Sequence, residues 1–200
     1  MINIKKLYLY NDIKHLDVKL YHYITKYYLN DIYKIFFRSM QLIKKQINLK
    51  STKPLCCVLD LDESFFQNDS FLYNTLHLWN YNSDLYNFYK SQKFIDKSFG
   101  PILPFMHILY SYLINKNIHI IFLSGRREKY RHLTINNLSY FNIDYKNYEL
   151  ILNDTNLSSH LYKQHHIEQI SNKYRIILCI NDQTEFCHPN LIQMPAIYNI

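Results

Sequence analysis

Glycine and proline are scarce in this chain of 200 residues, which contains only two glycines and five prolines. Linkers and disordered segments are usually rich in these residues, so the composition argues against tethered modules or a disordered chain. Hydrophobic residues make up 48% of the sequence and aromatic residues 16%. The chain therefore has enough apolar surface to bury one sizeable core.

Cysteine pairs with metal-binding spacing and long uncharged apolar runs are also missing. Three of the four cysteines, Cys56, Cys57 and Cys179, lie inside apolar runs, and no C-x-x-C pair occurs. This pattern argues against a structural zinc site or a disulfide scaffold and favours reduced thiols in the core. No uncharged run near the start has the length of a secretory signal or a transmembrane helix. We therefore expect an intracellular, cytoplasmic protein without a transmembrane segment.

The positive charge is concentrated at one end of the chain. Residues 1–53 contain 11 Lys and Arg against 3 Asp and Glu, a formal charge of +8, whereas the whole chain carries +7. A nucleic-acid arm, a membrane-surface helix and a helix with a solvated lysine face all produce such a pattern. The solvated face is the simplest of the three, so we do not expect nucleic acid to be the main partner.

Apolar periodicity predicts an α/β fold. From His15 to Ile47 apolar residues recur at helical spacing, which predicts one long amphipathic helix or two shorter ones packed on the main domain. Pro54 then marks a boundary. Continuous apolar runs that alternate with helical segments indicate a Rossmann-like parallel sheet covered by helices on both faces. The predicted strands are 55–61, 118–125, 148–154 and 174–182, and the predicted helices between them are 101–117, 126–141 and 158–173.

We accordingly divide the chain into two parts. Residues 1–53 are interpreted as a basic N-terminal helical segment that packs on the core, and residues 54–200 as the main domain. The aromatic and polar stretch 67–100 has weak periodicity, which is consistent with short helices or a small inserted cap.

Polar residues follow the predicted strands at the points where these end. The first strand leads into Asp60 and Asp62, the second ends in Ser124 and Gly125, and the fourth ends at Asp182. Parallel α/β sheets bind ligands at these carboxyl ends. Two carboxylates so close repel one another unless a cation lies between them or one keeps its proton. A D-x-D pair alone also fits a solvated loop, so a catalytic role for these aspartates depends on the residues at the other strand ends.

Those other strand ends supply groups that suit a phosphate ester and a metal ion. A hydroxyl and a glycine amide at Ser124 and Gly125 form a notch of phosphate size. Lys163, in the helix before the last predicted strand, adds a cation to the same crevice. Carboxylate oxygens are ligands that Mg²⁺ prefers, together with substrate phosphate and water.

Several segments, in order and spacing, resemble one family. "VLDLDESFFQND" resembles the D-x-D-x-T/S motif of the haloacid dehalogenase-like phosphatases, and "FLSGRREKYRHLTINNL" resembles the second motif of their class-B-like acid phosphatases, subfamily IIIB. "YKQHHIEQISNKYRIILCINDQTEF" and the closing "LIQMPAIYNI" are similar to the later motifs of that group. The group includes bacterial lipoprotein phosphatases and plant vegetative storage proteins. The likeness runs from Tyr21 to Ile200 and implies a haloacid dehalogenase-like fold with a small helical cap and N-terminal helices.

The resemblance also implies a mechanism and a role for each matching residue. Asp60 would be the nucleophile that forms a phosphoaspartyl intermediate, and Asp62 would act as general acid and then general base. Mg²⁺ would bind the Asp60 carboxylate, the Asp62 backbone carbonyl and the Asp182 carboxylate. The implied activity is a Mg²⁺-dependent phosphomonoesterase for nucleotides or other small phosphate esters. Its substrate-binding residues would be Ser64, Ser124, Gly125, Arg126 and Lys163.

The last motif departs from the family pattern G-D-x-x-x-D. Asn181 replaces its glycine and Phe186 occupies the position of its second acid. Glu185, one residue earlier, is long enough to reach a metal-bound water, but it fits a surface position equally well. Two alternatives therefore stay open beside the phosphatase: an inactive family member that serves as a binding or structural protein, and a nucleic-acid end phosphatase that uses the basic N-terminal segment.

Overall fold

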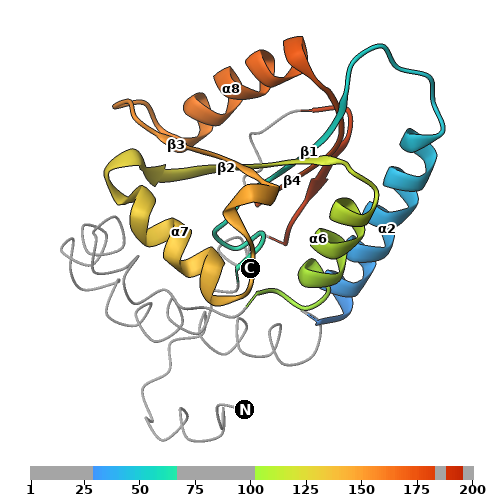
Figure 1. Ribbon diagram of the computed structural model, residues 1–200, viewed down its shortest axis with the longest axis horizontal. Helices are drawn as coiled ribbons and strands as arrows, with labels where there is room; N and C mark the ends of the chain where they lie inside the picture. Colours follow the sequence, from blue (N-terminus) through green and yellow to red (C-terminus); the bar gives the residue numbers. More distant parts are fainter. Residues whose placement is uncertain (1–28, 67–101, 183–187, 196–200) are drawn as a thin grey trace, which may run out of the picture.

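The computed structural model describes residues 29–66, 102–182 and 188–195, and its centre is a parallel β-sheet (Figure 1). The sheet has five strands in the order β3-β2-β1-β4-β5. All four neighbouring pairs are parallel. The strand bounds are Leu55–Leu59 for β1, His119–Arg127 for β2, Glu149–Asn153 for β3, Arg175–Asn181 for β4 and Leu191–Gln193 for β5.

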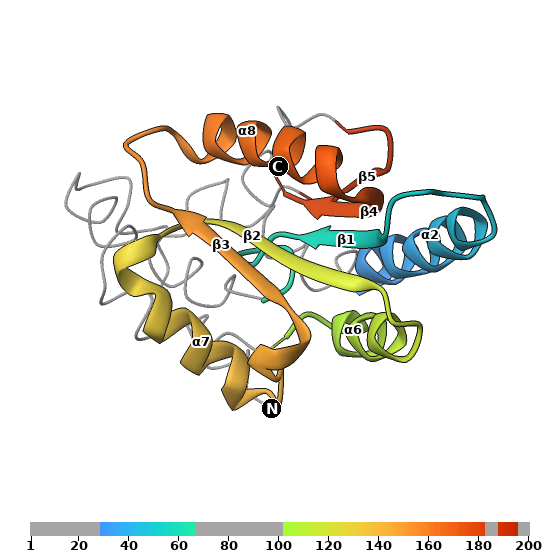
Figure 2. The same ribbon diagram turned by 45° about the horizontal axis from the view of Figure 1, so that its top comes forward.

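Helices cover both faces of the sheet (Figure 2). Helix α8 (Ser159–Lys173) lies on one face, and α2 (Leu29–Ile47), α6 (Met106–Asn115) and α7 (Arg131–Tyr140) lie on the other. Two short 3₁₀ helices, η3 (Glu128–Tyr130) and η4 (Tyr145–Asn147), connect these elements to the strands. The predicted α/β class with a parallel sheet between helical layers is confirmed.

The strands are apolar throughout because side chains on both faces of the sheet are buried. In β1, Cys57 and Leu59 pack in the core under α2 and α6, whereas Cys56 and Val58 pack in the core under α8. This alternation is what a strand with two covered faces requires. Burial raises the pKa of the Cys56 thiol to about 12. The described cysteines are free and buried, as the sequence predicted.

Helix α2 belongs to the same core as the sheet. Its buried residues Ile32, Ile35, Ser39 and Ile43 form one stripe, and the helix contacts β4, β5 and α6. The helical prediction for 15–47 is thus confirmed over 29–47. Its first part, residues 15–28, and the suggested cap at 67–100 lie outside the described residues. The division of the chain at residue 53 stays a prediction.

The structure differs from the prediction at the end of β2 and at β5, and each difference has a local cause. Strand β2 runs on to Arg127, so Arg126 lies on a strand instead of at the start of a helix. Strand β5 was not predicted, because its three residues are only partly buried and lack a continuous apolar signal. In the described segments, no helix combines the length and apolarity needed to cross a membrane.

The strand order creates a crevice beside β1. The chain continues from β1 to β2 and β3 on one side, whereas β4 and β5 lie on the other side. At such a switch point the connections leave the sheet in opposite directions and open a space above the carboxyl ends of the two central strands. Asp60 follows β1 and Asp182 follows β4, so this topology places both at the same crevice.

Candidate active site

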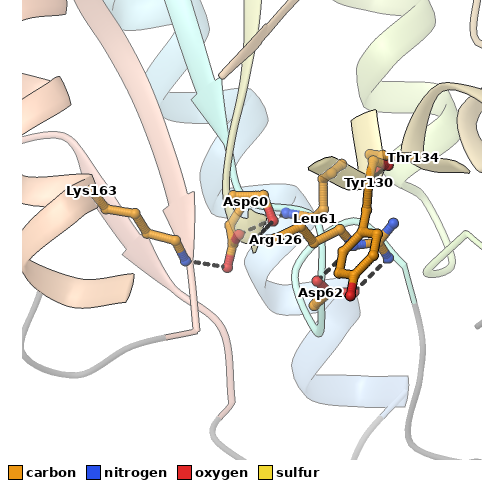
Figure 3. Close-up of polar contacts among 8 residues, drawn as sticks. Asp60, Leu61, Asp62, Arg126, Tyr130, Thr134 and Lys163 are labelled. Carbon is orange, nitrogen blue, oxygen red and sulfur yellow. Dashed lines mark hydrogen bonds and ion pairs between the residues drawn. The ribbon is translucent and has the colours of Figure 1, made fainter. Parts of the chain in front are cut away.

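Asp60 is fixed at the carboxyl end of β1 by contacts from both sides (Figure 3). Its backbone N–H donates to the Ile180 carbonyl at 2.9 Å, which continues the ladder between β1 and β4. One carboxylate oxygen, Oδ1, accepts from the Leu61 N–H at 2.8 Å. The other, Oδ2, lies 2.8 Å from the Nζ of Lys163. A buried carboxylate with a charged and a neutral donor is held in one orientation.

Lys163 reaches this carboxylate from the N-terminal half of α8. The helix begins after Ser158, whose Oγ accepts from the Leu161 N–H, so a serine cap sets where the helix starts. The Lys163 side chain is 4% exposed and also donates to the Oδ1 of Asn181 at 2.9 Å. A buried ammonium is costly unless it is paired, and here two oxygen atoms pair with it.

Asp182 is the second carboxylate of the crevice. Its pKa is raised to about 7, chiefly by desolvation. The negative charge of Asp60 and a hydrogen bond with that residue raise the pKa further, whereas the positive charge of Lys163 lowers it. Asp60 and Asp182 therefore share one small space, as predicted from the two strand ends. Two carboxylates in contact favour a proton or a cation between them.

Asp62 points away from Asp60 and toward Arg126 (Figure 3). Arg126 donates to its carboxylate from Nε at 2.9 Å and from Nη2 at 2.6 Å, a forked ion pair. Immediately after Asp62, Glu63 adopts a positive φ of 57°, so the chain turns directly after the D-x-D pair. The resemblance implied a role in substrate binding for Arg126, and the structure pairs it with the second acid of the D-x-D pair.

Ser124 and Gly125 lie at the end of β2 with different surroundings. The Ser124 Oγ is buried and accepts from the Arg126 N–H at 3.2 Å. A Cβ atom on Gly125 would lie 2.3 Å from the Oγ of Ser159, the first residue of α8. Glycine is therefore required for α8 to approach β2 this closely. This packing role is independent of the phosphate-binding role expected for the Gly125 amide. Ser64 is also buried, and its Oγ makes no hydrogen bond within the described residues.

The remaining predicted ligand, Glu185, lies outside the described residues. Within the described part of the chain, no group of three His, Cys, Asp or Glu side chains is arranged to hold a metal ion. Among the described residues the resemblance implies two side-chain ligands, Asp60 and Asp182, together with the backbone carbonyl of Asp62. The observed pair of oxygen donors, with its raised pKa at Asp182, fits Mg²⁺ chemistry.

Sequence reasoning missed the contact made by Asn181. The sequence shows only that Asn181 replaces the glycine of the family motif. In the structure its side chain is buried and accepts a hydrogen bond from Lys163. The signal that was available is its position next to Asp182, since a residue at the end of a central strand faces the same crevice.

A cavity of about 900 Å³ lies at the opposite, amino edge of the sheet. It is lined in part by Lys50, Lys53 and Arg175. Lys53 donates to the Ser171 carbonyl at 2.7 Å, at the end of α8, and Arg175 donates to the Gln46 carbonyl at 2.8 Å, at the end of α2. Cations at helix C-termini stabilise the helices. These contacts give the basic residues a structural role and give no support to a nucleic-acid partner.

The comparison with protein families agrees with this site. The chain matches the family model described as haloacid dehalogenase superfamily, subfamily IIIB (acid phosphatase), over residues 3–186. The chain therefore belongs to this family, and its class of enzyme is phosphomonoester hydrolase. No curated protein matches the chain.

Solved structures with the same fold include acid phosphatases. The class C acid phosphatase from Bacillus anthracis is 20% identical, with a TM-score of 0.70 over 85% of this chain and 70% of that chain. Its structure with tungstate bound gives 18% identity and a TM-score of 0.71 over 88% and 73% of the two chains. The Pnkp1/Rnl/Hen1 RNA repair complex contains a chain with 18% identity and a TM-score of 0.51 over 69% of this chain and 39% of that one. At these identities the likeness shows the fold alone, which confirms the predicted haloacid dehalogenase-like fold.

Proposed function

We propose that this protein is a Mg²⁺-dependent phosphomonoesterase that hydrolyses small phosphate esters, nucleotides among them, through a phosphoaspartyl intermediate on Asp60. The observation that carries the proposal is the meeting of Asp60, Lys163 and Asp182 at one crevice. These residues come from three separate parts of the chain; the fold buries Asp60 and Lys163 and leaves Asp182 half-buried beside them, although charged groups are costly to desolvate. Such an arrangement is typical of a catalytic site.

Asp60 is the nucleophile of the proposed reaction. Its carboxylate attacks phosphorus, forming a new P–O bond while the bond to the leaving alkoxide breaks. The contacts from Leu61 and Lys163 hold the carboxylate in one orientation before the substrate arrives. Lys163, Ser124 and the Gly125 amide stabilise the phosphoryl oxygens, where negative charge accumulates in the transition state. The buried Ser64 hydroxyl supplies a further donor.

Asp62 moves the protons. It donates a proton to the leaving oxygen, and it then takes one from the water that cleaves the acyl phosphate. Its side chain is 23% exposed while Arg126 holds it, so it is not sealed from water. The forked ion pair fixes the direction of the carboxylate and suits the second step, which needs its ionised form. In this proposal Arg126 orients Asp62 instead of serving mainly as a substrate ligand.

Asp60 and Asp182 would hold Mg²⁺ together with the backbone carbonyl of Asp62, and Glu185 would reach a metal-bound water. When bound, the ion supplies positive charge that offsets the repulsion between an anionic nucleophile and an anionic substrate. The two carboxylates need such a charge, because the pKa of Asp182 is raised while Asp60 lies beside it.

The test is hydrolysis of p-nitrophenyl phosphate and nucleoside monophosphates by the purified chain with and without added Mg²⁺. Asp60→Asn should lower kcat by a factor of about 10³ or more, because the amide cannot form the acyl phosphate. Asp31→Asn, at a partly exposed position in the first turn of α2, is the matched control and should leave kcat unchanged. Full activity in Asp60→Asn would refute the proposal.

A non-catalytic binding protein is the competing function, and the changes at Asn181 and Phe186 favour it. Thermal unfolding with increasing Mg²⁺ separates the two, because an ion that binds the native state must raise its stability. A shift together with turnover supports the phosphatase. If added Mg²⁺ causes no thermal shift and no ester is hydrolysed, the result supports the binding protein.

A further inference from the structure

The side chain of Asn181 has no counterpart in the family pattern, which places glycine at this position. We propose that Asn181 is part of the phosphate-binding site: its Oδ1 holds Lys163, and its Nδ2–H donates to an oxygen of the bound phosphoryl group. The inference rests on the proposed function in that it takes the crevice at Asp60 to be the phosphate site.

The first half of this inference follows from the position of Lys163 between two oxygen atoms. Its Nζ lies 2.8 Å from the Oδ2 of Asp60 and 2.9 Å from the Oδ1 of Asn181. Asn181 ends β4, and the pairing of Leu59 with Ile180 brings the end of β4 beside Asp60. With glycine at position 181, Lys163 would have one side-chain partner in place of two. Asn181 therefore limits the orientations that the ammonium group can adopt.

The second half follows from the orientation of the amide. An ammonium group can only donate, so the oxygen of Asn181 must face Lys163 and the nitrogen must face the other way. This nitrogen, Nδ2, is buried and has no hydrogen-bond partner among the described residues. A buried donor without an acceptor is unfavourable, and natural proteins keep such groups mainly where a ligand completes them. A phosphoryl oxygen held by Lys163 would be an acceptor at the right place.

The backbone shows that the change from glycine is tolerated. Asn181 pairs with Gln193 in the sheet, and its carbonyl accepts from the Met194 N–H at 2.9 Å. It is not among the residues with a positive φ, so the position does not need the conformational freedom of glycine. The substitution adds a donor and an acceptor to the site without straining the chain.

The test measures binding of inorganic phosphate to the full chain by isothermal titration calorimetry, in wild type, Asn181→Ala and Asn181→Gly. Both variants should bind phosphate about tenfold more weakly, since each loses a hydrogen bond to a charged ligand. Asn181→Asp keeps an acceptor for Lys163 but turns an oxygen toward the anion, so its binding should be weaker still. Asn190→Ala is the control: this amide donates to the Ile176 carbonyl away from the crevice, so phosphate affinity should not change.

The possible results separate this inference from the proposed function. Unchanged phosphate affinity in Asn181→Ala and Asn181→Gly would overturn the inference even if the wild type is an active phosphatase. A second result is that the wild type binds phosphate but hydrolyses no ester, while Asn181→Ala and Asn181→Gly show the expected loss of phosphate affinity. This result would support the inference and refute the phosphatase. If Asn181→Asp binds phosphate as well as the wild type, only the contact with Lys163 matters, and the role of Nδ2 is refuted. Absence of phosphate binding in the wild type would also overturn the inference.

Discussion

The two edges of the sheet use charged side chains in opposite ways. At the carboxyl edge, Asp60 and Lys163 are buried together, and Asp182 adds a second carboxylate whose pKa is raised by desolvation and then by the charge of Asp60. At the amino edge, the exposed Lys53 and the half-buried Arg175 donate to carbonyl groups at the ends of helices. The first arrangement costs desolvation energy, whereas the second costs little and satisfies backbone groups that would otherwise lack partners.

This difference favours the carboxyl edge as the functional one on physical grounds alone. Buried charges are weak evidence for stability, because well-packed apolar residues would often serve the fold as well or better. A fold that keeps such charges at one edge and avoids them at the other therefore retains them for chemistry. The prediction that follows is a separation of effects: substitutions at the carboxyl edge should change activity most, and those at the amino edge only stability.

Replacement of Lys163 should produce the largest effect. Lys163→Met removes the cation from the phosphoryl site, and we expect kcat to fall by a factor of about 10²–10³. Without metal at neutral pH it should also lower the free energy of unfolding by about 3–5 kcal/mol, because buried Asp60 loses its partner. Steady-state kinetics and urea unfolding measure the two quantities.

Lys53→Met is the matched control at the amino edge. Among the described residues the side chain of Lys53 makes one hydrogen bond, to the Ser171 carbonyl, so the free energy of unfolding should fall by about 1 kcal/mol or less and kcat should not change. Equal losses of activity in Lys163→Met and Lys53→Met would show that the chemistry is not confined to the carboxyl edge of the sheet.

The second-largest expected effect is a change in the stability of the metal-free chain with pH, caused by Asp182. The pKa of Asp182 is about 7 in the native state, against an ordinary value of 3.8. Between these values the native state holds a proton that the unfolded chain has released, so the stabilisation is complete below about pH 4 and is lost as the pH rises through 7. The free energy of unfolding should fall by at most about 1 kcal/mol per pH unit.

Asp182→Asn isolates this contribution from the other titrating groups. The difference in unfolding free energy between wild type and variant should slope with pH over this interval in the metal-free proteins. Added Mg²⁺ should stabilise the wild type more as the pH rises, since it binds ionised carboxylates. A difference that stays flat with pH would mean that Asp60 and Asp182 do not share one space in solution.

The sequence was sufficient to predict the sheet and the meeting of distant residues. Continuous apolar runs that alternate with helical segments indicated a covered parallel sheet, and its carboxyl ends brought together Asp60, Lys163 and Asp182. This part succeeds because strand direction alone decides which side chains share an edge. The roles of the site residues remain predictions that the experiments above test.

The pairing of individual side chains could not be predicted in the same way. Arg126 pairs with Asp62 because β2 continues beyond the predicted strand, so a boundary error changed where its side chain points. The contact of Asn181 with Lys163 depends on the depth at which α8 packs against β4. Such distances are set by tertiary packing and leave no periodic signal in the chain.

Replacement of Arg175 should lower stability and leave activity nearly unchanged, and this variant tests the amino edge most directly. Arg175 donates from Nη1 to the Leu49 carbonyl at 2.9 Å and from Nη2 to the Gln46 carbonyl at 2.8 Å. Arg175→Met should lower the free energy of unfolding by about 1–2 kcal/mol, because two carbonyls at the end of α2 lose a charged donor. The value of kcat should stay within about twofold of wild type, since the site lies beyond the other end of β4.

Arg175→Lys separates charge from geometry in this contact. Lysine keeps a positive charge near the helix C-terminus but lacks the forked donors, so its stability should fall between those of wild type and Arg175→Met. Loss of activity in Arg175→Met at temperatures where the protein is folded would show that the two edges are coupled through β4. Unchanged kcat with reduced stability would establish that charge at the amino edge serves the fold, and that the chemistry is confined to the edge where the charges are buried.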